Sequence, residues 1–113
     1  MNHIMRLDEE YFEMIKDGIK TVEYRLNDEK RQQIKVGDTI TFYKRPLEEE
    51  ILKVEVTDLK YYKNLLDMYT DTFSNHLKDL YNIPQEVVDD TTFYTQEEIN
   101  KYGCVAIFIK KVD

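Results

Sequence analysis

Ionisable side chains with complementary chemistry are concentrated in the segment GIKTVEYRL, residues 18–26. Its alternation of polar and apolar residues predicts a strand over 20–26. Because residues two apart on a strand share a face, Glu23 and Arg25 are expected side by side, with Thr21 next to them. The planar guanidinium of Arg25 suits a carboxylate or a phosphate. Glu23 can hold Arg25 in place, or act as a base where it is partly desolvated.

Lys20 is the third candidate in this segment, and its position depends on the turn before the strand. In a regular strand Lys20 points away from Glu23, but a bend after Gly18 would bring its amine to the same side. A lysine beside another cation in a dry pocket can have a lowered pKa and serve as a base or nucleophile. Two interpretations stay open: a pocket that contains these residues, or an exposed strand of ion pairs preceded by a lysine in a turn.

A second group, Tyr43, Lys44 and Arg45, stands at the end of a predicted strand over 38–45. An aromatic ring beside two cations suits a stacked base and a phosphate. The alternative is a strand end that runs into solvent. The sequence contains no P-loop, no G-x-S-x-G, no H-E-x-x-H and no cysteine–histidine cluster. We therefore expect neither a metal nor another cofactor.

Composition is typical of a globular protein with a single domain, residues 1–113. The chain is 42% hydrophobic and 35% charged, and no apolar run approaches the roughly 20 residues of a membrane helix. The single cysteine, Cys104, excludes an internal disulfide, and its apolar neighbours predict a buried structural thiol. These features favour an intracellular, cytoplasmic protein that does not enter a membrane.

The charge is unevenly distributed along the chain. The net charge is −7, but residues 20–45 hold seven basic and four acidic residues, a local charge of +3, so the remainder carries −10. A local basic region on an acidic body suits a small anionic ligand or a short nucleic-acid segment, and argues against extended non-specific binding. A solvated charged surface is the alternative.

Periodicity and capping residues predict strands interrupted by helices. Asp8 and Gly18 delimit a short helix, since Asp favours the N-cap and Gly the left-handed position after a helix. Thr95–Glu98 is a T-x-x-E capping box, and Gly103 closes the helix that follows it. The predicted order is a strand over 3–7, a helix over 8–17, a strand over 20–26, a short helix or turn over 27–38, strands over 38–45 and 50–59, helices from about 61 to 80 with a break at 70–72, a helix over 95–103 and an apolar strand over 104–112.

This succession of hairpin-like strands with inserted helices favours an α+β fold with a curled, mainly antiparallel sheet over a doubly wound parallel one. The apolar strand over 104–112 is expected at the centre of the sheet, covered on both faces. The segment after Pro84 is compatible with a loop or a helical turn. His76, with no second metal ligand at a suitable spacing, is expected to be an ordinary helical histidine.

Four stretches together resemble the ASCH domain, a small PUA-like β-barrel family: H-I-M-R-L, Tyr11-Phe12 with Ile15, G-I-K-T-V-E-Y-R-L-N-D-E-K-R and I-K-V-G-D-T-I-T-F. The family signature looks like G-x-K-x-x-E-x-R, which here is Gly18, Lys20, Glu23 and Arg25. The ending, from Tyr94 to the last strand, is similar to the closing helix and strand of the family. The resemblance is weakest from about 60 to 92. It implies one PUA-like domain, a curled, mainly antiparallel β-barrel with flanking helices.

The resemblance also implies classes of function. ASCH domains are viewed as RNA-binding or RNA-processing modules, and some small members are described as ribonucleases or as amidohydrolases that remove an acetyl group from modified cytidine. The amidohydrolase pattern has a lysine, a threonine three residues later and a distant glutamate. Lys20 matches the lysine, but Glu23 occupies the threonine position and Thr21 stands too near to replace it. The distant glutamate has no identifiable counterpart.

The resulting hypothesis is a module that binds RNA, a nucleotide or a nucleoside in a cleft around Lys20, Glu23 and Arg25. A small hydrolase of the same family, with Lys20 and Glu23 as catalytic residues, is the first alternative. An acidic protein-interaction domain is the second. The sequence does not determine the oligomeric state. The further ligand-binding candidates are Gly18, Thr21, Tyr43, Lys44 and Arg45.

Overall fold

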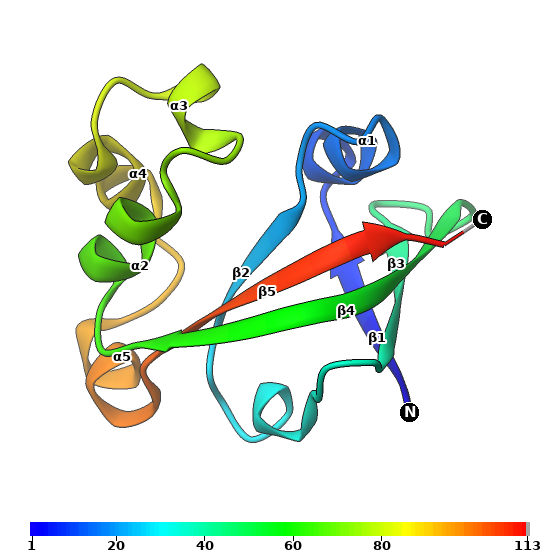
Figure 1. Ribbon diagram of the computed structural model, residues 1–113, viewed down its shortest axis with the longest axis horizontal. Coiled ribbons are helices and arrows are strands. Elements are labelled where there is room, and N and C mark those ends of the chain that lie inside the picture. The colour runs from blue at the N-terminus through cyan, green and yellow to red at the C-terminus, as the bar shows by residue number, and fades with distance from the viewer. Residues whose placement is uncertain (113) are drawn as a thin grey trace.

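The computed structural model describes residues 1–112. A curled sheet of five strands has helices packed along one side and at its ends (Figure 1). In chain order the elements are β1 (Asn2–Leu7), α1 (Glu9–Lys16), β2 (Val22–Leu26), the 3₁₀ turn η1 (Arg31–Gln33), β3 (Thr39–Lys44), β4 (Ile51–Tyr62), α2 (Leu65–Thr72), α3 (Leu77–Leu80), α4 (Pro84–Asp90), α5 (Gln96–Tyr102) and β5 (Cys104–Lys111).

The strand order is β1-β3-β4-β5-β2, so the first two strands in the sequence form the two edges of the sheet. β1 pairs with β3 in parallel, and the other three pairings are antiparallel. The sheet curls until its edges approach each other, and Nη2 of Arg25 on β2 donates to the Arg6 carbonyl on β1 at 3.0 Å. The predicted α+β fold with a curled, mainly antiparallel sheet is confirmed.

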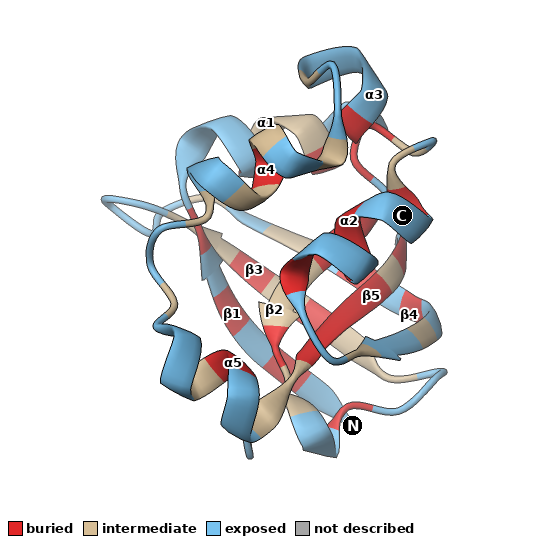
Figure 2. Ribbon diagram, turned by 90° about the vertical axis from the view of Figure 1, so that its left-hand side faces the viewer, coloured by how far each residue is buried: buried red, intermediate tan, exposed pale blue. Residues whose placement is uncertain are grey.

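Two apolar cores lie on the two sides of the sheet. Inside the curl, Phe12 and Ile15 of α1 pack against strand residues such as Phe42, and all three are almost fully buried. On the other side, α2, α4 and α5 cover β2 and β5, as the buried residues in Figure 2 show. β5 contributes alternate residues to both cores, Val105 to the first and Ala106 to the second. It is therefore covered on both faces, as its apolar sequence predicts, and it is an interior strand between β4 and β2, whereas β4 occupies the centre of the sheet.

The helix boundaries that depend on local chemistry are found where the sequence predicts them. Gly18 has φ 78° and Gly103 has φ 70°, both in the left-handed region that glycine favours after a helix. The Thr95 and Glu98 side chains form the reciprocal hydrogen bonds of a capping box. Asp8 occupies the N-cap position of α1 without a side-chain cap hydrogen bond. None of the helices among residues 1–112 is long and apolar enough to cross a membrane.

The boundaries that depend on tertiary pairing differ from the prediction. β4 continues to Tyr62, whereas the periodicity predicts a helix from about 61. A bulge between Val56 and Asp58 shifts the register of the strand and obscures its alternation of polar and apolar residues. The break in the helical region lies at 73–76, where Phe73–His76 connect α2 and α3, instead of at 70–72. The segment after Pro84 is helical, and Pro84 is its first residue, where its missing N–H costs nothing.

Candidate functional site

The turn after α1 determines where the Lys20 side chain lies. Gly18 reverses the chain, and the backbone N–H groups of Ile19 and Lys20 both donate to the Met14 carbonyl, at 2.9 and 3.0 Å. This turn delays the strand, so β2 begins at Val22 instead of at 20 as predicted. Lys20 lies before the strand, so the alternation of side chains along β2 does not determine the direction of its side chain. The bend after Gly18 lets its amine reach the side on which Glu23 lies.

Three charged side chains form a buried network, which we call the Lys20 cluster: Lys20, Glu23 and Arg25. Nζ of Lys20 lies 3.0 Å from Oε1 of Glu23. Arg25 donates to Oε2 of Glu23 from Nε at 3.1 Å and from Nη2 at 2.8 Å. The exposed fractions of the three side chains are only 6%, 4% and 16%. The alternative of an exposed strand of ion pairs is therefore excluded.

The two cations control the charge state of Glu23. Burial alone would raise the pKa of this carboxyl, but the charges of Lys20 and Arg25 outweigh burial and hold the pKa at about 2. Oε1 also accepts the backbone N–H of Tyr24 at 3.2 Å, so both carboxylate oxygens are engaged. The cluster holds two positive charges and one negative charge, which leaves a net charge of +1 in a largely desolvated position.

Aromatic and imidazole rings surround the amine of Lys20. Its Nζ lies 5.1 Å from the ring centroid of Tyr11 on α1 and 5.5 Å from that of Tyr24 on β2. The ring of His76 lies 6.0 Å from the Tyr24 ring, centroid to centroid. Desolvation, and then the charge of Lys20, lower the pKa of His76 to about 4, so its imidazole is neutral at pH 7. The His76 Nδ1 atom is buried and has no hydrogen-bond partner among residues 1–112.

The expectation for His76 as an ordinary helical histidine is wrong in position, because it lies between α2 and α3. The connection between two helices, and not a helical face, carries this side chain to the Lys20 cluster. The only sequence signal for it is the interruption of the helical stripe near Thr72. That signal marks a connection but does not indicate what the connection approaches.

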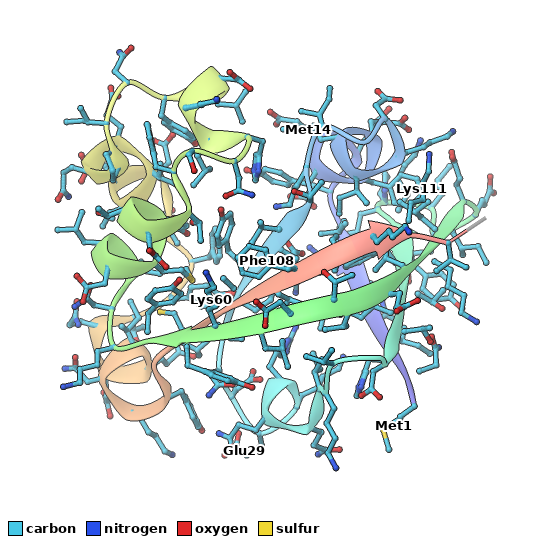
Figure 3. The ribbon with its side chains drawn as sticks, viewed as in Figure 1. Met1, Met14, Glu29, Lys60, Phe108 and Lys111 are labelled. Carbon is cyan, nitrogen blue, oxygen red and sulfur yellow. The ribbon has the colours of Figure 1, made fainter. Side chains whose placement is uncertain are left out.

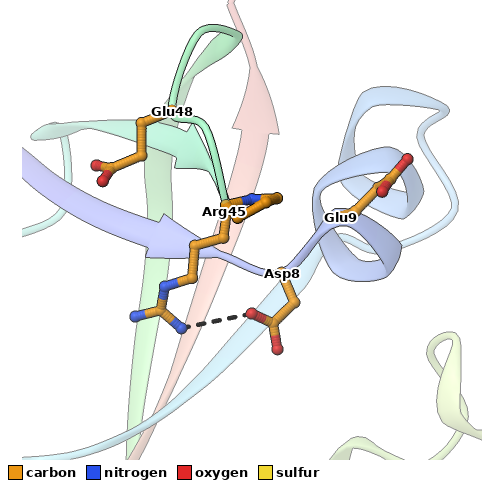
Figure 4. Close-up of a pocket in the computed structure, with 5 residues that line it drawn as sticks. Asp8, Glu9, Arg45 and Glu48 are labelled. Carbon is orange, nitrogen blue, oxygen red and sulfur yellow. Dashed lines mark hydrogen bonds and ion pairs between the residues drawn. The ribbon is translucent and has the colours of Figure 1, made fainter.

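The structure does not bring Tyr43, Lys44 and Arg45 to the Lys20 cluster. Lys44 is paired with Glu13 at 2.8 Å and with Glu50 at 3.1 Å. Arg45 lies 3.5 Å from Asp8 in a cavity of about 570 Å³ (Figure 4). The cavity contains three carboxylates and one arginine, so its charge disfavours an anion: its lining is Asp8, Glu9, Arg45, Pro46 and Glu48.

The remaining predicted residues have structural surroundings. Thr21 precedes the strand and is exposed, whereas Glu23 is buried, and the Thr21 carbonyl accepts the N–H of Ile109 at 2.9 Å. Its role in ligand binding stays a prediction. Gly18 is exposed, and it contributes the positive φ angle that the turn after α1 requires. Cys104 is buried, and burial raises the pKa of its thiol to about 11, as expected of a structural cysteine. Among the described residues no group of three acidic, histidine or cysteine side chains could hold a metal ion.

A cavity of about 630 Å³ lies at the other end of β2, beside Asn27, and like the cavity beside Arg45 it does not include the Lys20 cluster. Beside the cluster, the Tyr11 side chain over Lys20 is 42% exposed, so the cluster lies just below the protein surface. The predicted cleft around Lys20, Glu23 and Arg25 stays a prediction. What the structure establishes is the buried, positively charged network itself.

Comparisons with known proteins agree with the fold. The ASCH domain model matches residues 5–113. The chain is 38% identical to the hypothetical protein PH0355, with a TM-score of 0.86, covering 99% of this chain and 100% of that one. It is 35% identical to protein PF0455 from Pyrococcus furiosus, with a TM-score of 0.72 and coverage of 100% and 99%.

A mutant of the ASCH protein from Zymomonas mobilis is 14% identical, with a TM-score of 0.60, covering 99% of this chain and 73% of that one. At this identity the likeness concerns the fold alone. A comparison with curated proteins finds no match.

Proposed function

The chain belongs to the ASCH domain family, and from this premise we propose that it binds RNA or a nucleotide-like ligand at the Lys20 cluster. One observation carries the proposal: two buried cations, Lys20 and Arg25, share a single carboxylate, Glu23. An excess positive charge in a desolvated position attracts a phosphate or a carbonyl oxygen more strongly than an exposed lysine does.

The cluster retains hydrogen-bond donors for a ligand. An ammonium group has three N–H donors, and Lys20 gives one of them to Glu23. The Nη1 group of Arg25 makes no hydrogen bond within residues 1–112, whereas its Nε and Nη2 are engaged by Glu23 and the Arg6 carbonyl. Glu23 thus fixes the two cations in place and leaves part of each available.

The rings beside Lys20 suit the base of such a ligand. Nucleobases stack on aromatic and histidine side chains, and single-stranded RNA is recognised largely in this way. Tyr11 is partly exposed next to the Lys20 amine, and the neutral His76 lies close to Tyr24. A phosphate or carbonyl at Lys20 and Arg25 would bring an attached base near these rings.

Binding is favoured over hydrolysis by the state of Glu23. A carboxylate with a pKa near 2 and both oxygens engaged is a poor general base at neutral pH. Glu23 also stands where the amidohydrolase pattern has a threonine. The neutral imidazole of His76, with its unpartnered Nδ1, keeps a hydrolase of modified nucleosides or RNA as the second candidate.

The test is an amide NMR titration of isotope-labelled protein at low salt with cytidine monophosphate, acetylated cytidine and a short single-stranded RNA. We expect shifts at Lys20–Arg25 and around His76. The variant Lys20→Met should weaken binding by about tenfold or more, since it removes a charge-assisted contact. Lys53→Met, an exposed lysine on β4, is the matched control and should leave binding unchanged.

Two outcomes would decide against the proposal. Absence of shifts around the Lys20 cluster with all three ligands, or unaltered affinity in a folded Lys20→Met variant, would remove the cluster from ligand binding. Each sample is also analysed by mass spectrometry after the titration. A converted product that disappears in Lys20→Met would establish the hydrolase instead of the binding module.

A further inference from the structure

The cavity beside Asn27 lies at the opposite end of β2 from Lys20. It is bounded by the end of β4, the residue that follows β2 and the last turn of α5, and its volume is about 630 Å³. Figure 1 places α5 at the lower end of the molecule, whereas α1 and α3 lie at the upper end. We call this cavity the tyrosine basin, and its principal side chains are Asn27, Tyr61, Tyr62, Lys63, Lys101 and Tyr102.

The charged side chains that line the tyrosine basin are basic, although the protein as a whole is acidic. The chain has 23 acidic residues and a net charge of −7, yet no carboxylate lines the basin, whereas Lys63 and Lys101 do. Two carboxylates accept hydroxyl groups of the basin, Asp71 that of Tyr62 and Glu29 that of Tyr102, and they keep their negative charge, so the positive charge is confined to the lining itself. Two lysines without acidic partners in the lining make this a local site for an anion.

One aromatic side chain of the tyrosine basin is largely exposed, whereas Tyr62 and Tyr102 pack partly against the second core. Tyr61 is 56% exposed at the end of β4, although most large aromatic side chains in this fold pack into a core. Nζ of Lys101 lies 5.0 Å from the centroid of the Tyr102 ring, so a cation and an aromatic face stand side by side. This is the combination that binds a base by stacking and its phosphate by charge.

One polar atom of the tyrosine basin lacks a partner. The backbone of Asn27 is fixed, because its N–H donates to the Gly103 carbonyl at 3.0 Å. The side-chain oxygen Oδ1 of Asn27, however, is buried without a hydrogen-bond donor among residues 1–112. Buried polar atoms are nearly always satisfied, and because this oxygen is itself inaccessible, the Asn27 side chain has to rotate towards the basin before a ligand donor can reach it.

We propose that the tyrosine basin is a second ligand site that takes a nucleotide unit, an aromatic base carrying a phosphate. The base stacks on Tyr61, the phosphate lies between Lys63 and Lys101, and Asn27 accepts a hydrogen bond from the base once its side chain has rotated towards the basin. The cavity volume falls within the range of about 300–1,000 Å³ that is usual for small-ligand sites. None of these residues belongs to the Lys20 cluster, so this inference goes beyond the proposed function and does not depend on it.

The separation of the two sites limits what one ligand can contact. β2 has five residues, which at about 3.3 Å per residue span roughly 17 Å. A single nucleotide in the tyrosine basin therefore does not reach Lys20, which a short single strand can, whereas Arg25 stands only two residues before Asn27 and lies nearer to the basin. Either a free nucleotide or one nucleotide of an RNA strand has the required chemistry, and uridine monophosphate and a short single-stranded RNA distinguish these sources.

The experiment is an amide NMR titration of the whole chain with uridine monophosphate, uridine, inorganic phosphate and a short single-stranded RNA. With the nucleotide or the RNA we expect shifts at Tyr61–Lys63 and at Asn100–Cys104. Uridine and inorganic phosphate should each bind about tenfold more weakly, because each lacks one of the two contacts. Shifts with uridine monophosphate identify a free nucleotide as sufficient, and shifts only with RNA identify a strand.

Variants separate the tyrosine basin from general charge effects. The double variant Lys63→Ala/Lys101→Ala should weaken binding by about tenfold or more, and Tyr61→Ala by a similar factor. Lys60→Ala is the matched control, because this β4 lysine lies over the Phe108 ring, with Nζ 5.4 Å from its centroid, outside the basin (Figure 3). It should change affinity by less than about twofold.

The proposal is overturned if the basin amides do not shift with either the nucleotide or the RNA. It is also overturned if the folded double variant binds as well as the native protein, or if inorganic phosphate alone reproduces the shifts at equal concentration. Lys20→Met distinguishes the two sites. Basin shifts that persist in Lys20→Met support the second site even where binding at the Lys20 cluster has failed.

Discussion

Glu23 is the residue on which the Lys20 cluster depends, because it is the one carboxylate between two largely buried cations. A buried ion network is seldom more stabilising than apolar side chains of the same volume, since each charge must first be removed from water. Stability therefore does not by itself account for the presence of this network. The ligand that we propose for the excess positive charge of Lys20 and Arg25 would account for it.

Replacing Glu23 tests how strongly the cluster is desolvated. Glu23→Gln leaves Lys20 and Arg25 without a counter-charge and should lower the free energy of unfolding by about 3–5 kcal/mol. Lys20→Met leaves Glu23 paired with Arg25 and should cost less. Urea unfolding followed by circular dichroism measures both. A cost below about 1 kcal/mol for Glu23→Gln would indicate that water screens the cluster and that its pairs behave like surface ion pairs.

His76 and Glu23 should both make the protein less stable in acid, in different pH windows. His76 has a pKa of about 4 in the folded protein, below its ordinary 6.5, so the unfolded chain binds the proton more readily and stability falls as the pH drops from 6.5 to 4. Glu23 has a pKa of about 2, below its ordinary 4.5, so the stability it contributes is present above pH 4.5 and is lost as the pH falls towards 2.

Of these two groups, only His76 changes the free energy of unfolding between pH 6.5 and 4.5. The slope of this free energy against pH can reach about 1.4 kcal/mol per pH unit. His76→Gln should flatten the dependence of the urea midpoint on pH in that window. Glu23→Gln should leave this slope in place and flatten the curve below pH 4.5. An unchanged slope in His76→Gln would mean that the imidazole is not held neutral by its surroundings.

Elements whose residues decide their own structure could be predicted from the sequence, and elements decided by distant contacts could not. The alternation in β3, the apolar run of β5 and the capping box at Thr95 all predict what is observed. The last residues of β4 pair with the first residues of β5, more than 40 positions away, and a bulge obscures their alternation. Their local sequence therefore resembles a helical stripe.

The residues of the candidate site could likewise be predicted only where their spacing along one strand decides their position. The spacing of Glu23 and Arg25 predicts that they share a face, and this pairing is confirmed. His76 reaches the cluster only through the packing of α2 and α3, and Lys44 is held by Glu13 of α1, which lies far away in the sequence. Asn27 and Tyr61 are brought to one basin by the meeting of β2, β4 and α5. No local pattern indicates these neighbours.

Two glycines at helix ends provide a matched test of the turns that position the sites. Gly18 and Gly103 have similar φ values of 78° and 70°, but an added Cβ at Gly18 meets no atom within 4 Å, whereas at Gly103 it lies 2.8 Å from the Tyr62 carbonyl oxygen. Gly18→Ala should cost about 1–2 kcal/mol for the left-handed conformation alone. Gly103 has ψ −169°, a conformation that is essentially restricted to glycine, and its alanine variant adds a backbone clash, so its cost should be clearly larger.

Urea unfolding of the two alanine variants measures this difference. Gly18→Ala should also retain the contact between Lys20 and Glu23, so its binding at the cluster should be close to native. Gly103→Ala should displace the end of α5 from β4 and with it the lining of the tyrosine basin. Equal costs for the two substitutions would show that the chain at Gly103 moves freely away from Tyr62.

At the scale of the whole molecule, the charge is segregated. The chain carries −7 overall, yet the Lys20 cluster has an excess of one positive charge and the tyrosine basin presents two lysines without an acidic lining residue. The acidic surface repels a long polyanion, while each of these two positions is one at which we propose that a single phosphate binds. The arrangement suits a short strand or a nucleotide and disfavours extended binding along a nucleic-acid backbone.

The salt dependence of RNA binding tests this segregation directly. For single strands, the logarithm of the binding constant falls with the logarithm of salt concentration at a slope of about −0.7 per neutralised phosphate. One or two phosphates give a slope of about −0.7 to −1.4, so raising salt fourfold should weaken binding of a short RNA by roughly three- to sevenfold. Lys63→Ala/Lys101→Ala should make the slope shallower if the strand also enters the tyrosine basin. A slope steeper than about −3 would require more than four phosphate contacts and would contradict the segregated arrangement, because an acidic molecule with two small cationic positions cannot neutralise so long a strand.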